Sequence, residues 1–282
     1  MWYFYIKQRQ MILFPNAKIN IGLQVTGNRP DGYHDIETIF YPVSLSDALE
    51  FVVSDQQTNK DILKVTGIST GSDPEDNLVI RTVKKLREIN SFPFLKIHLH
   101  KVIPIGAGLG GGSSDAACLL KTINRLFGLD ITDNKLKAIA LELGSDCPFF
   151  IDCIPSYASG IGEVLTPVKP VLNGYYLVII NPGVGINTGE AYQNCRTGLP
   201  STSLFQLIDR PVIEWKGLII NAFEDFAFNK HPIIGELKEE LYRSDALFSL
   251  MSGSGSSVYG IFSEKPKLPQ KLKDFVIWEE MM

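Results

Sequence analysis

The sequence predicts a fold of the α+β class. Apolar residues recur with the period of a helix in some segments and with the period of a strand in others, along the whole chain. A cleanly alternating segment, 95–102, is followed by a helical pattern over 113–127, so the two kinds of element are neighbours. Hydrophobic residues make up 45% and charged residues 21% of the 282 residues, which excludes a wholly disordered chain.

Local patterns define the elements of the first half. Residues 28–32, Asn-Arg-Pro-Asp-Gly, form a turn, and residues 73–76 carry the start signals of a helix with an apolar side over 78–89. The alternation in 95–102 is typical of a half-buried antiparallel strand. The expected strands are 12–25, interrupted at Pro15-Asn16, then 45–53, 62–66 and 95–102.

Helices over 113–127 and 135–143 follow, ended by Gly128 and Gly144, and the alternation restarts after Pro167. The elements expected there are a strand over 175–180, helices over 188–195 and 236–242, and a strand over 258–262. We therefore expect two domains, 1–165 and 166–282, with residues 1–10 as an extension before the first recognisable strand.

Charge and apolar patterning exclude several classes of protein. The 27 Lys and Arg residues against 31 Asp and Glu residues give a net charge of −4, so neither nucleic acid nor an anionic membrane is an expected partner. The longest apolar run, 175–180, is far shorter than the ~20 residues of a membrane span. The aromatic start lacks the features of a signal peptide. The four cysteines form no C-x-x-C, so we expect reduced thiols and a cytoplasmic protein.

The histidines give no clear metal site. His98 and His100 share one face of an expected strand, but no cysteine or acidic residue accompanies them at ligand spacing. A polar strand face is the favoured interpretation.

The most informative segment is a glycine-rich loop between an expected strand and an expected helix. Five glycines within 106–112 let the backbone turn tightly and bring N–H groups close to a ligand. The helix that begins near Ser113 directs its free N–H groups to the same place, which favours an anion. We therefore expect a phosphate-binding loop made of Pro104, Ile105, Gly106, Ala107, Gly108, Leu109, Gly110, Gly111, Gly112, Ser113 and Ser114.

Other interpretations of this loop are weaker. Gly106, Gly108 and Gly111 fit G-x-G-x-x-G, with Asp130 in loose range for a ribose-binding acid, but an alternating strand does not suit a Rossmann sheet. A Walker A loop requires a lysine that this segment lacks. A connector without a ligand would be entropically costly for so glycine-rich a segment.

Several motifs resemble those of the GHMP kinases, which include galactokinase, homoserine kinase, mevalonate kinase and phosphomevalonate kinase. The phosphate loop of that family, Pro-x-Gly-x-Gly-Leu-Gly-Ser-Ser, is similar to 104–114, and its C-terminal Gly/Ser loop is similar to 251–258. Within the family, the chain is most similar to members that phosphorylate a cytidine-diphosphate-linked alcohol. The stretches behind this narrower resemblance are Pro15-Asn-Ala-Lys-Ile-Asn-Ile-Gly-Leu23, Arg29-Pro-Asp-Gly-Tyr-His-Asp-Ile-Glu-Thr38, Gly110-Gly-Gly-Ser-Ser-Asp-Ala-Ala117 and Leu143-Gly-Ser-Asp-Cys-Pro-Phe-Phe150.

The resemblance covers about 11–262 and implies an ATP domain like domain 2 of ribosomal protein S5, a smaller ferredoxin-like domain, and an active site in the cleft between them. It implies ATP as phosphoryl donor together with Mg²⁺. It does not assign the Mg²⁺ ligand, for which the hydroxyl groups of Ser113 and Ser114 are two candidates.

The resemblance also assigns roles to residues that sequence alone would leave as a turn cap or a strand residue. It implies Asp146 as the general base and Lys18 as its electrostatic partner. Asn77 and the backbone of Lys101 are expected near the nucleotide base. The residues expected to bind the cytidine-linked substrate are Asn20, Tyr33, His34, Thr188 and Tyr192, with the cytosine between the two tyrosines.

We therefore expect ATP-dependent phosphorylation of the 2-hydroxyl of a cytidine-diphosphate-linked alcohol, in the non-mevalonate route to isoprenoid precursors. One alternative is another small-alcohol kinase of the family, of the homoserine or mevalonate type. A second alternative, from a different class, is a non-catalytic regulator that binds ATP. The sequence does not specify an oligomeric state.

Overall fold

The structure is a computed structural model that describes residues 10–54, 59–69, 71, 73–198 and 202–282. The chain forms two compact units. Unit 1 contains residues up to Ala17 together with Leu45–Ile105 and Gly111–Asp152, and unit 2 contains Lys18–Ser44, Gly106–Gly110 and Cys153–Met282. Packing therefore groups residues 18–44 with the C-terminal part of the chain, while the domain boundary at 165/166 stays a prediction. Of the expected extension 1–10, only Gln10 is described, and it begins the first strand.

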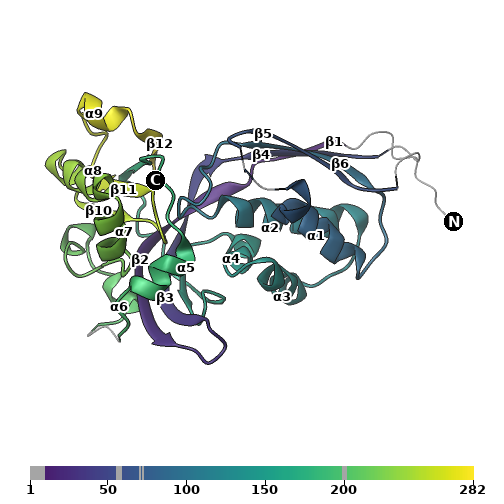
Figure 1. Cartoon of the computed structure of the whole chain (residues 1–282), viewed down its shortest axis with the longest axis horizontal. Helices are drawn as coiled ribbons and strands as arrows, with labels where there is room; N and C mark the ends of the chain where they lie inside the picture. Colours follow the sequence, from purple (N-terminus) through teal and green to yellow (C-terminus); the bar gives the residue numbers. More distant parts are fainter. Residues whose placement is uncertain (1–9, 55–58, 70, 72, 199–201) are drawn as a thin grey trace. The chain divides into compact units, whose positions relative to one another are not determined.

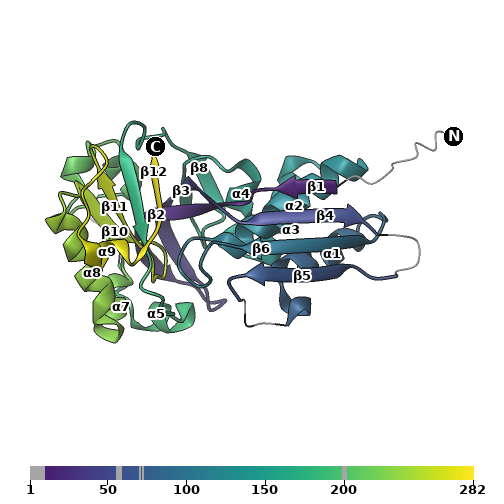
Figure 2. The same cartoon turned by 90° about the horizontal axis from the view of Figure 1, so that it is seen from above.

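Unit 1 is a sheet with helices packed on one face, and its strands lie side by side in the order β1-β4-β6-β5 (Figures 1 and 2). These strands are β1 (Gln10–Leu13), β4 (Ala48–Val53), β6 (Leu95–Lys101) and β5 (Ile62–Gly67). The helices are α1 (Leu78–Arg87), preceded by the 3₁₀ turn η1 (Pro74–Asp76), α2 (Gly111–Phe127), α3 (Asp133–Leu143) and α4 (Cys147–Asp152).

Strand β6 matches its predicted pattern only in part. Leu95, Ile97 and Leu99 are buried and alternate with more exposed residues, so the half-buried strand is confirmed. The prediction of antiparallel pairing holds for β4 but is wrong for β5, which runs parallel to β6. The reason is that α1 carries the chain from β5 to β6, and such a helical crossover returns the chain in the same direction.

Unit 2 contains two four-stranded sheets, and helices pack on the second of them. The first sheet has the order β2 (Asn16–Asn28), β3 (His34–Ser46), β7 (Ser156–Ser159) and β8 (Val164–Pro167). The second has the order β10 (Phe248–Met251), β11 (Val258–Phe262), β9 (Tyr176–Ile180) and β12 (Val276–Met281). The helical segments are α5 (Thr188–Asn194), α6 (Leu204–Leu207), η2 (Val212–Glu214), α7 (Glu224–Lys230), α8 (Pro232–Arg243) and α9 (Gln270–Lys273).

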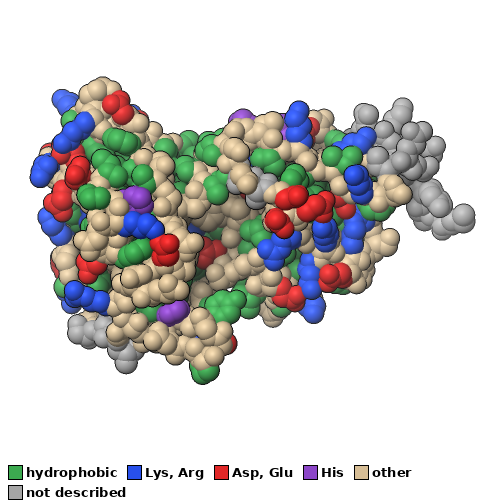
Figure 3. Space-filling model, viewed as in Figure 1, with side chains coloured by type: hydrophobic (Ala, Val, Ile, Leu, Met, Phe, Trp, Pro, Cys, Tyr) green, Lys and Arg blue, Asp and Glu red, His purple; other side chains and the backbone are tan. Residues whose placement is uncertain are grey.

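The core of unit 2 lies between α8 and its sheet, where Leu237 and Leu241 pack with Val178, Ile180 and Val258. The predicted α+β class is confirmed. Positive and negative side chains are interspersed on the face shown in Figure 3, as the near balance of charges in the sequence leads one to expect. No helix in the described part of the chain has the length and apolar character needed to span a membrane.

Candidate active site

In unit 2, the central part of the glycine-rich loop that is expected to bind phosphate is held by hydrogen bonds from two other segments. Lys18 in β2 donates its N–H to the carbonyl oxygen of Leu109, with 3.0 Å between the two atoms. The Gly/Ser loop, residues 252–257 between β10 and β11, also contacts this segment. The Ser252 hydroxyl donates to the carbonyl oxygen of Gly108 at 2.8 Å, and the Ser257 N–H donates to that of Ala107 at 3.2 Å. The two glycine-rich motifs therefore form one hydrogen-bonded structure.

Gly108 has to be glycine in this structure. Its φ of +75° lies in the left-handed region, and a Cβ atom at this position would lie 1.8 Å from the carbonyl oxygen of Ser252. Such a contact is impossible without moving one of the loops. The close approach of the two backbones thus explains the residue type at the centre of the loop.

Lys18 and Asn20 are buried side by side on β2, with 3% and 2% of their surfaces exposed. The Lys18 ammonium group donates to the side-chain oxygen of Asn20 and lies 5.0 Å from the ring centroid of Phe40. Asn20 in turn donates its amide to the hydroxyl of Thr38 at 2.8 Å, and its backbone N–H to the hydroxyl of Ser252 at 3.1 Å. Asn20 therefore orients the lysine and links β2 to the Gly/Ser loop.

The Gly/Ser loop is itself held by Asn221, which is 4% exposed. Its amide donates to the carbonyl oxygens of Met251 and Gly253, both at 2.8 Å. Thr188, at the start of α5, lies within hydrogen-bond distance of Ser254 in the same loop, with 2.9 Å between the hydroxyl oxygens. Three of the residues expected in the site, Asn20, Gly108 and Thr188, are thus brought to one loop.

His34 and Tyr192 form an aromatic pair in unit 2. Their rings are stacked, with 4.6 Å between the centroids, and Tyr192 also contacts Phe223 edge to face at 4.9 Å. Tyr33 does not share this contact and is 59% exposed. The structure therefore brings together two of the three aromatic residues expected around a cytosine.

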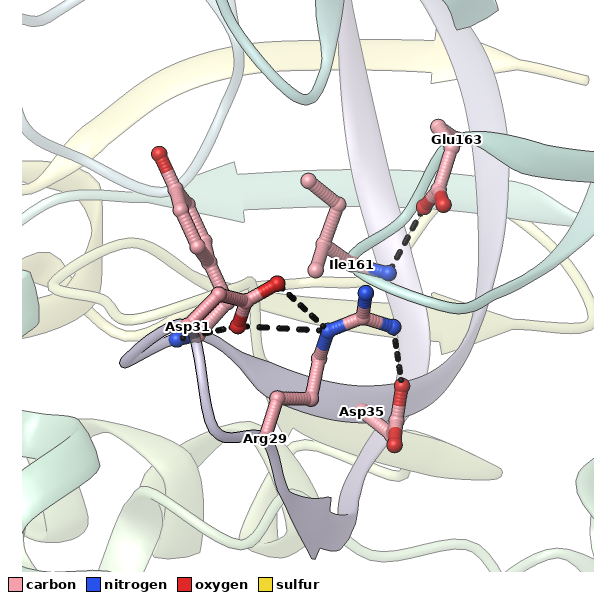
Figure 4. A network of polar contacts seen from close by, with 6 residues as sticks. Arg29, Asp31, Asp35, Ile161 and Glu163 are labelled. Atoms are coloured by element: carbon pink, nitrogen blue, oxygen red, sulfur yellow. Dashed lines mark hydrogen bonds and ion pairs between the residues drawn. The ribbon is translucent and has the colours of Figure 1, made fainter.

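The turn that presents His34 is braced by ion pairs. Arg29 lies between Asp31 and Asp35 (Figure 4), and the nitrogen–oxygen distances of the two ion pairs are 3.1 and 3.0 Å. The backbone N–H of Tyr33 donates to Asp31 at 3.1 Å, and this bond lowers the pKa of that exposed carboxyl group. These contacts favour the observed conformation of the turn, although exposed ion pairs contribute little stability individually.

In unit 1, the first turn of α2 lies against the turn that carries Asp146. An added Cβ atom at Gly144 would lie 3.9 Å from the hydroxyl oxygen of Ser113 and 3.4 Å from the sulfur of Cys147. Asp146 is half-buried and directly precedes α4. The turn that contains Asp146 therefore lies next to the first turn of α2, and a helix N-terminus with a nearby carboxylate is a combination suited to transfer of phosphate to a hydroxyl group.

Cys147, next to Asp146, is a poor nucleophile. The thiol is fully buried, and burial raises its pKa to about 11, with a hydrogen bond from Ser113 acting in the opposite direction. At neutral pH the group is therefore a thiol and not a thiolate. We assign it a structural role.

Asn77 and Lys101 take part in local structure in unit 1. The side chain of Asn77 caps α1 by accepting the N–H of Val79 at 2.9 Å. The Lys101 ammonium group is buried between the carboxylates of Asp47 and Asp115. The backbone carbonyl oxygen of Lys101 accepts the N–H of Ile68 at 3.0 Å. The side chain of Lys101 is therefore committed to an internal ion cluster.

Protein ligands for a metal are few in the residues that the structure describes: no group of three or more His, Cys, Asp and Glu side chains is arranged to hold one. Mg²⁺ in phosphoryl-transfer sites usually takes one or two protein oxygens and completes its shell with phosphates and water. Ser113 is half-buried at the first turn of α2, whereas Ser114 is 2% exposed. This donor set fits a metal that arrives on a nucleotide, with Ser113 as the accessible oxygen.

Sequence reasoning missed several residues that hold the site. Thr38 and Ser252 fall within motifs that the sequence analysis quotes, but nothing local marks their hydroxyl groups as the partners of Asn20. Asp47 and Asn221 lie outside every quoted motif. Their roles depend on partners distant in the sequence, so no sequence pattern could have identified them.

Comparison with known proteins adds the following. The model of the GHMP kinases N terminal domain matches residues 77–157, and that of the GHMP kinases C terminal matches residues 204–276. A relative named 4-diphosphocytidyl-2-C-methyl-D-erythritol kinase, from Bacteroides thetaiotaomicron, is 49% identical over 261 residues, which cover 92% of this chain and 95% of the relative.

Two solved structures resemble the chain at different levels. A crystal structure of 4-(cytidine 5'-diphospho)-2C-methyl-D-erythritol kinase has a TM-score of 0.72 and 31% identity, covering 89% of this chain and 90% of that chain. A homoserine kinase from Cytophaga hutchinsonii has a TM-score of 0.55 and 18% identity, covering 94% and 88%. The second similarity shows a shared fold alone.

Proposed function

The chain belongs to the GHMP kinase family, and from this premise we propose that it transfers the γ-phosphoryl group of ATP to the 2-hydroxyl of 4-diphosphocytidyl-2-C-methyl-D-erythritol. It is a kinase that acts on a small molecule, and the reaction belongs to the non-mevalonate route to isoprenoid precursors. The identity of 49% to a relative with this name supports the choice of substrate over homoserine or mevalonate.

The observation that carries the proposal is the contact between the first turn of α2 and the Gly144–Cys147 turn. Free N–H groups at the helix terminus suit the phosphates of ATP, and in this proposal Asp146, the residue before Cys147 in that turn, accepts the proton. In the reaction, the hydroxyl oxygen of the substrate bonds to the γ-phosphorus and its proton passes to Asp146. The bond from that phosphorus to the bridging oxygen breaks, and ADP leaves.

Lys18 supplies positive charge in this proposal. Its ammonium group is held in place by Asn20, so the charge is oriented before the reaction starts. Such a fixed cation lowers the energy of negative charge that develops on the transferred group. The Ser113 hydroxyl would hold a Mg²⁺ ion that arrives with the nucleotide, and the ion would neutralise further phosphate charge.

The cytidine end of the substrate is assigned to unit 2. His34 and Tyr192 offer ring faces and a polar imidazole edge, and Tyr33 and Thr188 add a second aromatic face and a hydroxyl group. Stacking and hydrogen bonds of this kind select one base over others. The proposal includes a cytoplasmic location, supported by the presence of all four cysteines as thiols.

The test is an assay coupled to ADP release, with the cytidine substrate, homoserine and mevalonate as acceptors. We expect ADP release with the cytidine substrate alone, and its loss in Asp146→Asn. Turnover of homoserine or mevalonate instead would assign the chain to another kinase of the family. ATP binding without turnover of any acceptor would favour the non-catalytic regulator.

A further inference from the structure

We propose that Asp47, Lys101 and Asp115 form a buried ionic bracket that ties together the two ends of the phosphate-binding loop and keeps the loop in the conformation that binds ATP. The proposal rests on the proposed function in so far as this loop is taken as the ATP site. The three residues are positioning residues, because they act on the nucleotide through the loop backbone.

The bracket joins the element before the loop to the element after it. Lys101 is the last residue of β6, and Asp115 lies in the first turns of α2, which begins at Gly111. The Lys101 ammonium group donates to Asp115 with 2.8 Å between nitrogen and oxygen, and it also donates to Asp47. A single charged group thus fixes both ends of the loop.

Asp47 extends the bracket to the backbone that enters the loop. Its second carboxylate oxygen accepts the N–H groups of Val102 and Ile103, at 2.5 and 2.9 Å. Hydrogen bonds from backbone N–H groups to a carboxylate are among the stronger ones in proteins. The direction of the chain at the loop entrance is therefore fixed by Asp47.

The exit of the loop is pressed against the bracket. A Cβ atom at Gly111 would lie 3.2 Å from the Lys101 ammonium nitrogen and 2.9 Å from the side chain of Ile103. The start of α2 consequently has little freedom to move toward β6. The proposed function assigns the N–H groups of this first turn to the phosphates of ATP, so the bracket would set the position of those groups.

The energetics argue for a role other than stability. Asp47, Lys101 and Asp115 are 0%, 4% and 2% exposed, and two carboxylates face one ammonium group. One oxygen of Asp115 is buried without a hydrogen-bond partner among the described residues. Burying such groups is costly, and apolar residues often replace a buried ion cluster without loss of stability. We therefore attribute the presence of this costly cluster to its role in holding the loop for ATP binding.

The test separates ATP affinity from stability. Asp115→Ala removes the link to α2 and leaves one ion pair, Lys101 with Asp47, that has no net charge. Asp115→Asn keeps an oxygen that accepts from Lys101. The matched control is Thr122→Ala, a truncation at a residue of α2 that is 6% exposed and whose hydroxyl donates to the Cys118 carbonyl oxygen of its own helix.

We expect Asp115→Ala to weaken ATP binding about 10-fold or more, the size of effect that a small displacement of positioned groups produces. The Kd is measured by equilibrium titration with ATP, and the melting temperature is measured beside it so that a loss of affinity is compared among folded variants only. Asp115→Asn should recover most of the affinity, and Thr122→Ala should leave it unchanged. In steady state, the KM for ATP should rise more than the KM for the cytidine substrate.

Unchanged ATP affinity in a folded Asp115→Ala variant would overturn the bracket, as would an equal loss in Thr122→Ala. If Asp115→Ala does not fold, Asp47→Asn tests the entrance of the loop instead. The amide keeps an oxygen that accepts from Val102 and Ile103 but has no second acceptor for Lys101. The same loss of ATP affinity is expected. The titration needs no turnover, so failure of the substrate assignment, seen as absent ADP release with the cytidine substrate, remains a separate outcome.

Discussion

The imidazole ring of His34 and the phenol ring of Tyr192 lie nearly parallel, with 18° between their planes. They come from β3 and α5, which are far apart in the sequence, and Phe223 supports the tyrosine from a second direction. A base-binding site needs rigid ring faces of this kind.

Loss of either ring should weaken binding of the cytidine substrate. We expect Tyr192→Ala and His34→Ala to raise the KM for this substrate by the equivalent of ~1–3 kcal/mol, because one stacking or hydrogen-bonding partner is removed. The KM for ATP should remain nearly unchanged. Tyr33→Ala tests whether the cytosine lies between the two tyrosines, in which case its effect matches that of Tyr192→Ala. Loss of ATP affinity in both the Tyr192 and His34 variants would mean that the cytosine site is wrongly assigned. The substrate could then be that of any GHMP kinase.

Bulk in the phosphate-binding loop should weaken ATP binding. Gly110 has a φ of +69°, and we expect Gly110→Val to lose ATP affinity because a side chain keeps the backbone from the phosphates. Gly108→Ala should lower the melting temperature as well, since its Cβ atom meets Ser252. Gly217→Val is the control, because Gly217 has a φ of +78° with nothing within 4 Å of its Cβ position. ATP titration of a folded Gly110→Val variant with unchanged affinity would rule out the loop as the phosphate site.

Replacement of Asp146 should slow the reaction and spare ATP binding. Asp146→Asn keeps the shape of the side chain but removes the proton acceptor, so turnover should fall by roughly 10²–10⁴-fold. Asp152→Asn, at a carboxylate of α4 that pairs with Lys137, is the control and should turn over normally. Single-turnover rates and ATP titration separate the two quantities. A rate close to that of the wild type in Asp146→Asn would make this aspartate structural.

Stability should depend on pH through Asp115. Burial raises its pKa from 3.8 to about 7, against the opposing influence of the Lys101 ammonium group and with Asp47 adding to the rise. A carboxyl group with a raised pKa binds more protons in the folded chain than in the unfolded chain, so its contribution to the free energy of unfolding falls as pH rises through this interval.

Asp115→Asn removes this titration. Relative to the wild type, the variant should therefore gain stability between about pH 5 and about pH 8. Urea denaturation of both proteins at the two pH values measures the change. An equal response of wild type and variant would mean that Asp115 does not titrate in this range.

Most segments with a clear period could be predicted from the sequence. The strand 95–102, the helix 113–127 and the helix 135–143 correspond to β6, α2 and α3, because each buries one face and therefore shows its period. β3 was missed. It is buried on both faces over much of its length, so it lacks the alternation that marks a strand with one exposed face.

The candidate site also has parts that could be predicted from the sequence and parts that could not. The glycine-rich loop could be found because the residues that define it are consecutive in the sequence. The hydroxyl group that fixes Gly108 belongs to Ser252, 144 positions away, and the carboxylate that fixes Lys101 belongs to Asp47, 54 positions away. Contacts at such separations depend on the packing of whole elements, which a local pattern does not contain.

The buried thiol of Cys147 bears on how the enzyme could be inhibited. It is adjacent in sequence to Asp146, and a cysteine so close to a proposed general base is an attractive target for an electrophilic drug. Alkylating agents react with thiolates, and a pKa of about 11 together with complete burial leaves almost none of that form at physiological pH. Compounds that compete reversibly for the nucleotide or cytidine sites are therefore a better starting point than covalent warheads.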